Sequence, residues 1–221
     1  MTTYKYFTLI DYLSVFTMDP SWHHPFTSVV AGPTSCGKTE WVKRFLTHLP
    51  EMVMPAPTKI LLSYGEWQPT YQSLLGKVDF VQGLPDLPLY STEPLLLVID
   101  DQMHNVDQRI SSLFTKGSHH RNISIIYIVQ NLFDQHKEHR TISLNAHYMV
   151  IFKNPRDKSQ ITHLAKQMYP GRIKYVQEAF ELATAQPHGY LLVDLKQSTP
   201  EGLRLRSHIF PGENQKVYMQ D

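Results

Sequence analysis

The chain has 221 residues, of which 42% are apolar and 19% are charged, and this composition excludes an intrinsically disordered protein. Its length is sufficient for one well-buried α/β domain, so we expect a single domain over residues 1–221. Lysine and arginine number 21 against 20 acidic residues, so the formal charge of +1 gives no overall attraction to nucleic acid or to a membrane.

The first elements predict a strand, a loop and a helix. Residues 1–25 show no clear periodicity, and we expect them to form an N-terminal strap or an oligomer contact. The segment "PFTSVVAG" is apolar and β-branched, which favours a strand, and "KTEWVKRFLTHL" follows after glycines. This second segment predicts a helix with its apolar residues on one face: Trp41, Val42, Phe45, Leu46 and Leu49.

Further strands and helices alternate along the rest of the chain. We expect strands at 59–64, 78–83, 95–99, 123–129 and 148–152, then two more in "HGYLLVDL" and "LRLRSHIF", joined as a hairpin or sheet extension across "KQSTPEG". We expect helices around 67–75, 106–114, 157–169 and 172–183. Several strands are apolar without alternation, as strands covered on both faces are. The pattern predicts an α/β fold with a mostly parallel central sheet and helices on both faces, comprising a core over 26–195 and a C-terminal strand extension and tail over 196–221.

The segment "GPTSCGKT" matches the phosphate-binding loop pattern G-x-x-x-x-G-K-[ST], in the strand–loop–helix context that this pattern requires. In such a loop the backbone N–H groups surround the phosphates, Lys38 contacts the β- and γ-phosphate oxygens, and the Thr39 hydroxyl is a ligand of Mg²⁺. We interpret Cys36 as incidental rather than as a nucleophile, because backbone matters more than side chain in this loop; a redox-sensitive thiol is the weaker alternative. The predicted nucleotide-binding residues are Gly32, Pro33, Thr34, Ser35, Cys36, Gly37, Lys38 and Thr39.

The segment "LLLVIDDQM" ends a buried strand on two aspartates. An acid at the carboxyl end of such a strand lies on the Mg²⁺ side of a P-loop site, so we assign Asp100 to the metal. Asp101 is then the base that polarises the attacking water, although a glutamate is more usual there. Alternatively, Asp101 caps the turn that follows.

The strand "ISIIYIV" ends in Gln130 and Asn131. An amide in this position can hold the water and sense the γ-phosphate, and we assign this role to Gln130 and a capping or turn role to Asn131. If this strand lies between the P-loop strand and the acidic strand, the fold belongs to the additional-strand branch of P-loop ATPases. No guanine-reading "NKxD" element is present, which disfavours a GTPase.

Several blocks together resemble the DNA-packaging ATPases of the FtsK/HerA superfamily, in particular those of Maverick/Polinton elements and related double-stranded DNA viruses. The resemblance extends over roughly residues 24–211, and the blocks are "HPFTSVVAGPTSCGKT", "WQPTY", "LLLVIDDQM", "GSHHRNISIIYIVQNLF", "FKNPRDKSQI" and "YLLVDLKQSTPEGLRLRSHIFP". The resemblance implies an oligomeric, ring-forming motor that hydrolyses ATP to move double-stranded DNA into a capsid. By position, the loop from Gly32 to Thr39 matches the family's Walker A motif, Asp100 and Asp101 its Walker B pair, and Gln130 its polar sensor.

An arginine of a neighbouring subunit is expected to stabilise charge on the γ-phosphate in such a ring. Arg121 is our first candidate, followed by Arg156 and Arg140; alternatively, these are ordinary surface arginines. The block with Lys116, His119, His120 and Arg121 is either a contact to the DNA backbone or a solvated face, and "RLRSH" offers a second basic strip with the same alternatives. Adjacent histidines without further ligands predict no metal besides Mg²⁺.

A soluble, intracellular protein is expected, acting at the site of virion assembly in an infected cell. One cysteine excludes an intrachain disulfide, no signal peptide opens the chain, and the apolar runs are too short to span a membrane. Its expected partners are double-stranded DNA, further copies of itself and a capsid or portal protein. The alternatives are another DNA pump or helicase of the same fold, and a catalytically silent subunit that binds ATP only to hold a ring together.

Overall fold

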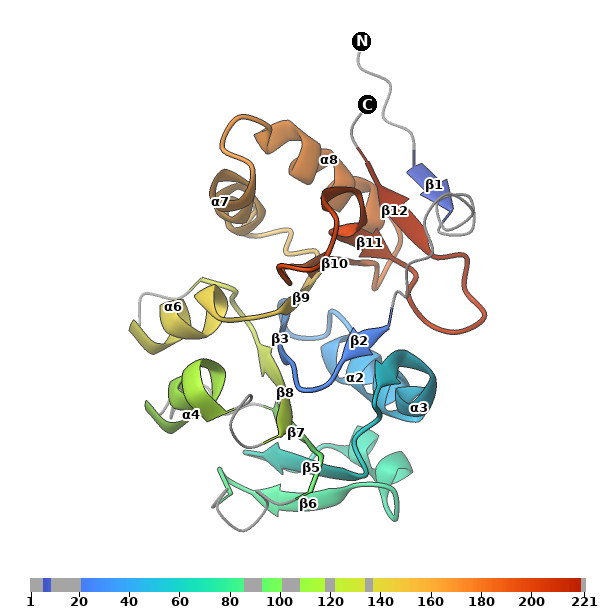
Figure 1. Ribbon diagram of the computed structural model, residues 1–221, viewed down its shortest axis with the longest axis vertical. Helices are drawn as coiled ribbons and strands as arrows, with labels where there is room; N and C mark the ends of the chain where they lie inside the picture. Colours follow the sequence, from blue (N-terminus) through green and yellow to red (C-terminus); the bar gives the residue numbers. More distant parts are fainter. Residues whose placement is uncertain are drawn as a thin grey trace.

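The computed structural model describes residues 6–8, 21–85, 93–100, 108–117, 122–133 and 137–219, with backbone alone at 6–8 and 116–117. A sheet of ten strands runs through the described chain, in the order β1-β12-β11-β10-β9-β3-β8-β7-β5-β6 (Figure 1). The strands are β1 (Tyr6–Thr8), β3 (Thr27–Ala31), β5 (Lys59–Tyr64), β6 (Asp79–Gln82), β7 (Leu95–Asp100), β8 (Ile123–Val129), β9 (Tyr148–Phe152), β10 (Tyr190–Asp194), β11 (Leu205–Ser207) and β12 (Lys216–Tyr218). A separate small parallel pair joins β2 (Trp22–His23) to β4 (Val53–Met54).

The strand order confirms the predicted fold class. From β9 through β3, β8, β7 and β5 to β6, neighbouring strands are all parallel, whereas β10, β11, β12 and β1 add to β9 in antiparallel fashion. The strand β8 lies between β3, which precedes the P-loop, and β7, which ends in Asp100. This insertion is the arrangement expected of the additional-strand branch.

Two apolar cores cover the two faces of the sheet. On one face, Val29 and other inward residues of the strands pack against α4 (Gln108–Ser112), α6 (Lys137–Leu144), α7 (Ser159–Met168) and α8 (Ile173–Ala183). On the other face, Val30 and its counterparts pack against α2 (Lys38–Thr47), α3 (Leu49–Met52) and η1 (Pro69–Leu74). Figure 1 shows these two helix layers on opposite sides of the sheet. Successive residues of a strand point to opposite faces of the sheet, and both faces are covered. Side chains on both faces are therefore buried, which is why the strands are apolar without alternation.

Most predicted elements are present, and three differ for local reasons. The first helix ends at Thr47 rather than at Leu49, because Pro50 lacks an N–H and would clash with the preceding turn, so Leu49 begins α3. The segment predicted as a helix over 67–75 forms the 3₁₀ helix η1, in which Tyr71 and Leu74 are buried at a spacing of three residues. The helix predicted over 106–114 is described from Gln108 and continues after α4 as a π-helix, η4 (Leu113–Gly117).

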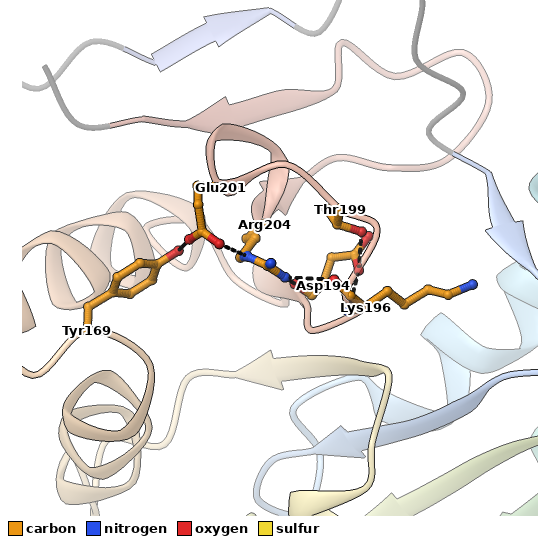
Figure 2. Close-up of polar contacts among 6 residues, drawn as sticks. All are labelled: Tyr169, Asp194, Lys196, Thr199, Glu201 and Arg204. Carbon is orange, nitrogen blue, oxygen red and sulfur yellow. Dashed lines mark hydrogen bonds and ion pairs between the residues drawn. The ribbon is translucent and has the colours of Figure 1, made fainter.

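The C-terminal hairpin is tied to the core by the polar network in Figure 2. The Asp194 carboxylate accepts hydrogen bonds from the Lys196 N–H and the Thr199 hydroxyl. The Arg204 guanidinium donates to the Asp194 and Lys196 carbonyls and to Glu201, which also accepts a bond from the Tyr169 hydroxyl of the α7–α8 connection. The antiparallel pairing of β10 with β11 confirms the expected hairpin.

The interpretation of "RLRSH" as a basic surface strip is wrong. Arg206 is 3% exposed, and its guanidinium donates to the Asp194 carboxylate at 2.7 Å. Burial lowers the pKa of Arg206, and the negative charge of Asp194 opposes this effect. Since Arg204 is also bonded within the hairpin, these arginines hold the fold together and present neither a DNA-binding strip nor a solvated face.

At the N-terminal side, β1 pairs with β12 at the edge of the sheet, and the remainder of residues 1–20 lies outside the described residues. The predicted oligomer contact there stays a prediction. Within the described part of the chain, no helix has both the length and the apolarity needed to cross a membrane.

Candidate active site

The strand register brings the predicted site residues to one edge of the sheet. Ala31, the last residue of β3, is aligned with Val129 of β8, and Ile99 of β7 is aligned with Tyr127 of β8. Because all three strands are parallel, their carboxyl ends meet at this edge. The P-loop after β3, Asp100 at the end of β7 and Gln130 after β8 therefore converge, as open α/β sheets place their ligand sites.

The P-loop contains two glycines that no other residue can replace without a shift. Gly37 lies directly before α2 with φ of 107°, a left-handed conformation that favours glycine. A Cβ on Gly32 would lie 2.7 Å from both the Cys36 sulfur and the Phe152 Cβ. The loop thus folds back tightly over the end of β9.

Lys38 is anchored within this loop. Its Nζ donates to the carbonyl oxygens of Gly32 at 2.6 Å and Pro33 at 2.9 Å. These bonds hold the ammonium group against the backbone of the loop. Anionic phosphate oxygens can replace the neutral carbonyls as its acceptors.

Cys36 has the character of a structural thiol. Burial raises its pKa, and the positive charge of Lys38 opposes that rise. A thiol kept protonated is a poor nucleophile, which agrees with its interpretation as incidental.

Asp100 is positioned by two hydroxyl donors. Its side chain is 4% exposed, and Oδ2 accepts a bond from the Tyr71 hydroxyl at 2.7 Å and from the Thr39 hydroxyl at 3.4 Å. The Thr39 hydroxyl also lies 3.5 Å from Oε1 of Gln68. A carboxylate and a hydroxyl this close form a hard oxygen donor set of the kind that binds Mg²⁺ together with nucleotide phosphates, so these residues fit the predicted metal.

A hollow of about 420 Å³ joins these groups. Its lining comprises Thr34, Ser35, Gly37, Lys38, Thr39, Glu40, Gln68, Thr70, Asp100, Ile128, Val129 and Gln130. The structure therefore brings together Lys38, Thr39, Asp100 and Gln130 as the sequence predicted, while their roles stay predictions.

Asn131 occupies a different environment from Gln130. Its side-chain oxygen accepts a bond from Nε2 of Gln160 at 3.3 Å, while Oε1 of the same glutamine accepts the Leu132 N–H at 2.8 Å. Gln160 belongs to α7, so Asn131 helps to fix the end of β8 to that helix. This contact agrees with the turn role assigned to Asn131.

Three residues of the site had no role assigned from the sequence. Gln68 and Tyr71 contact Thr39 and Asp100, and the only signal for them was the block "WQPTY" among the family-like segments. His188 contacts the P-loop from the α8–β10 connection, since its Nδ1 donates to the Cys36 carbonyl at 3.0 Å. Nothing in its local sequence signals this contact, which is 152 residues away along the chain.

Several candidates cannot be placed. Asp101, His119, His120 and Arg121 lie outside the described residues, as does the side chain of Lys116. The predictions for these residues therefore stand as they were.

The two remaining arginine candidates are described. Arg140 on α6 and Arg156 between β9 and α7 are exposed, and neither lines the hollow around Lys38. An arginine that acts on a neighbouring subunit has no need to line its own site, so both stay candidates.

Comparisons with known proteins bear on the fold. Neither protein-family models nor curated protein sequences gave a match. Among solved structures, the chain is similar to the genome packaging NTPase B204 from Sulfolobus turreted icosahedral virus 2 in complex with ATP-gammaS, with 14% identity and a TM-score of 0.53, covering 92% of this chain and 99% of that one. The ATPase DotB of Legionella pneumophila is matched at 10% identity and a TM-score of 0.34, over 76% of this chain and 54% of that chain, and this likeness carries no argument. The similarity to the packaging NTPase establishes a shared α/β fold with a mostly parallel central sheet.

Proposed function

We propose that the protein is an ATPase of the FtsK/HerA type that hydrolyses ATP to move double-stranded DNA into a viral capsid. The observation that supports this most directly is the convergence of Lys38, Thr39 and Asp100 on one hollow. The strand β8 is inserted between β3, which leads into the P-loop, and β7, which ends in Asp100. The fold shared with a viral genome packaging NTPase and the family-like sequence blocks point to the same work.

In this proposal the residues of the P-loop bind and orient the triphosphate. Lys38 exchanges the carbonyls of Gly32 and Pro33 for β- and γ-phosphate oxygens. The Thr39 hydroxyl and the Asp100 carboxylate would hold Mg²⁺, which would supply positive charge against the phosphates. The Tyr71 hydroxyl orients the Asp100 carboxylate, and the side-chain oxygen of Gln68 accepts from the Thr39 hydroxyl.

The remaining steps are assigned to Gln130, to Asp101 and to a neighbouring subunit. Gln130 orients the attacking water, and Asp101 accepts its proton. Arg121 of an adjacent copy, or else Arg156 or Arg140, stabilises the charge that develops on the γ-phosphate. We therefore propose a homo-oligomeric ring, recruited to a capsid or portal protein at the site of virion assembly in an infected cell.

Steady-state ATP hydrolysis with Mg²⁺, measured with and without linear duplex DNA, tests this function. The native chain is compared with Lys38→Ala and Asp101→Asn. Lys77→Ala and Asp79→Asn are matched controls, since both residues are exposed and neither lines the hollow. We expect turnover that rises with duplex and falls by at least about 100-fold in the two site variants, while the controls keep native turnover.

Two other results would change the assignment. The silent-subunit function is kept as an alternative because an aspartate stands where a catalytic glutamate is usual. ATP binding that depends on Lys38, without turnover under conditions of assembly, would favour that alternative. Turnover that duplex DNA does not change would argue against a DNA motor.

A further inference from the structure

A second hollow, of about 450 Å³, lies against the other side of the P-loop. It is formed where the P-loop meets the end of β9 and the α8–β10 connection, and β9 lies on the side of β3 opposite to β8 and β7. Its lining comprises Pro33, Thr34, Ser35, Cys36, Phe152, Lys153, Pro155, Thr184, Ala185, Gln186, Pro187, His188 and Gly189. Asp100 and Gln130 belong to the first hollow alone, so the two hollows differ in chemistry.

The two hollows meet at Thr34 and Ser35, which line both. A nucleoside triphosphate likewise has two ends: an anionic end suited to Lys38 and Thr39, and an uncharged base and sugar. The second hollow combines the exposed apolar rings of Pro155 and Pro187 with polar side chains such as Gln186. A base and a sugar present both kinds of surface, so this mixed lining suits the nucleoside as a small-molecule site. Its volume is within the range of such sites.

The connection that forms one wall of this hollow also holds the P-loop. His188 has a left-handed backbone, with φ of 61°, and donates from Nδ1 to the Cys36 carbonyl. Next to it, Gly189 is tightly packed, because a Cβ there would lie 2.6 Å from the Ala183 carbonyl oxygen. The wall is therefore tightly packed at Gly189, and its position is linked through one hydrogen bond to the position of the phosphate-binding backbone.

We propose that the second hollow binds the nucleoside end of the nucleotide and that His188 couples this binding to the phosphate-binding loop. The proposal rests on the function proposed above, because it takes the P-loop as a nucleoside triphosphate site. A nucleoside bound in the hollow restrains the 184–189 connection, and the hydrogen bond from His188 then restrains the backbone around Cys36. The nucleoside thus contributes affinity directly and by preparing the loop for the phosphates.

Calorimetric titration with ATP and with inorganic tripolyphosphate, both with Mg²⁺, tests the hollow. The native chain is expected to bind ATP about tenfold or more tightly than tripolyphosphate. Ala185→Trp and Pro155→Trp fill the hollow from two walls, and both residues are exposed. Each is expected to reduce ATP affinity to the level of tripolyphosphate without changing tripolyphosphate affinity.

Ala56→Trp is the matched control, since Ala56 is partly exposed and lines neither hollow. It should bind both ligands as the native chain does. Native ATP affinity in both Ala185→Trp and Pro155→Trp would overturn the nucleoside site. Because two walls are changed independently, failure of one variant to fold leaves the other to decide.

A pair of substitutions at one position tests the coupling. His188→Gly removes the imidazole and tolerates the left-handed backbone, and it is expected to weaken tripolyphosphate binding about fivefold or more. His188→Asn keeps an N–H donor the same number of bonds from the backbone as Nδ1 and also tolerates this conformation, so it should restore the affinity. Equal tripolyphosphate affinity in the native chain and in His188→Gly would overturn the coupling.

These readouts are separate from those of the proposed function. If duplex DNA stimulates no hydrolysis but the native chain still binds ATP more tightly than tripolyphosphate, the proposed motor function is wrong and the nucleoside site is supported. If duplex DNA stimulates hydrolysis but both hollow-filling variants bind ATP as the native chain does, the nucleoside site is wrong and the motor function is supported.

Discussion

Asp100 depends on a tyrosine that lies outside the P-loop motif. The Tyr71 hydroxyl is buried, and its 2.7 Å bond to Oδ2 fixes the carboxylate that faces Thr39. We expect Tyr71→Phe to raise the Mg²⁺ concentration needed for half-maximal ATP hydrolysis by about 10- to 100-fold, since outer-shell donors of metal ligands have effects of this size. A magnesium titration of steady-state turnover measures the shift.

Tyr64→Phe is the matched control for this substitution. Tyr64 belongs to the same aromatic cluster, with its ring centroid 6.0 Å from that of Tyr71. Its backbone is aligned with Asp100 between β5 and β7, but in the described part of the chain its hydroxyl makes no hydrogen bond to that carboxylate. Its magnesium dependence should be native. A shift of equal size in both variants would mean that the cluster as a whole, and not the bond to Asp100, sets the metal site.

At the residue scale, the sequence predicted the groups that a local motif encodes. Lys38 and Thr39 follow from the loop pattern, and Asp100 and Gln130 follow from their places at strand ends. The roles of Tyr71 and His188 depend on contacts with residues 29 and 152 positions away, and no local pattern records such contacts. The candidate site was therefore predictable where one element defines it and not where two elements meet.

At the scale of elements, apolar runs predicted the strands well. The expected strands at 59–64, 123–129 and 148–152 have the same bounds in the structure, because strands covered on both faces carry an unbroken apolar signal. The helix α6 was not predicted, since in its eight residues only Ile142 and two polar side chains are buried. A short helix with so few apolar residues takes its stability from packing against its neighbours rather than from its own pattern.

The C-terminal strands depend on one buried ion pair. Asp194 and Arg206 join β10 to β11 with side chains that are 6% and 4% exposed. We expect Asp194→Asn to lower the free energy of unfolding by about 3 to 5 kcal/mol, because the Arg206 guanidinium then stays buried without that carboxylate. Urea denaturation followed by circular dichroism measures the change.

The exposed ion pair of the same hairpin provides the comparison. Glu201 is 69% exposed at its side chain, so Glu201→Gln weakens its pairing with Arg204 in a well-solvated position. A loss below about 1 kcal/mol is expected there. Similar losses in both variants would show that burial does not set the strength of these pairs.

At the scale of the whole molecule, the charge balance bears on the proposed binding of DNA. The formal charge is +1, and two arginines of the suspected basic strip are bonded inside the C-terminal hairpin. One copy therefore has little net positive charge with which to attract the phosphate backbone. A ring would place cations from every copy on one duplex, and such multivalency raises affinity without any new contact.

We therefore expect duplex binding to be weak for a single copy and to strengthen as the protein assembles. Fluorescence anisotropy of a labelled duplex, measured across protein concentration alongside sedimentation velocity, tests this expectation. The anisotropy should rise only at concentrations where oligomers form, and the affinity should fall steeply with salt because several phosphates are contacted at once. Equal affinity at every assembly state would instead place a complete DNA site on each copy, and the ring would then be unnecessary for holding the duplex.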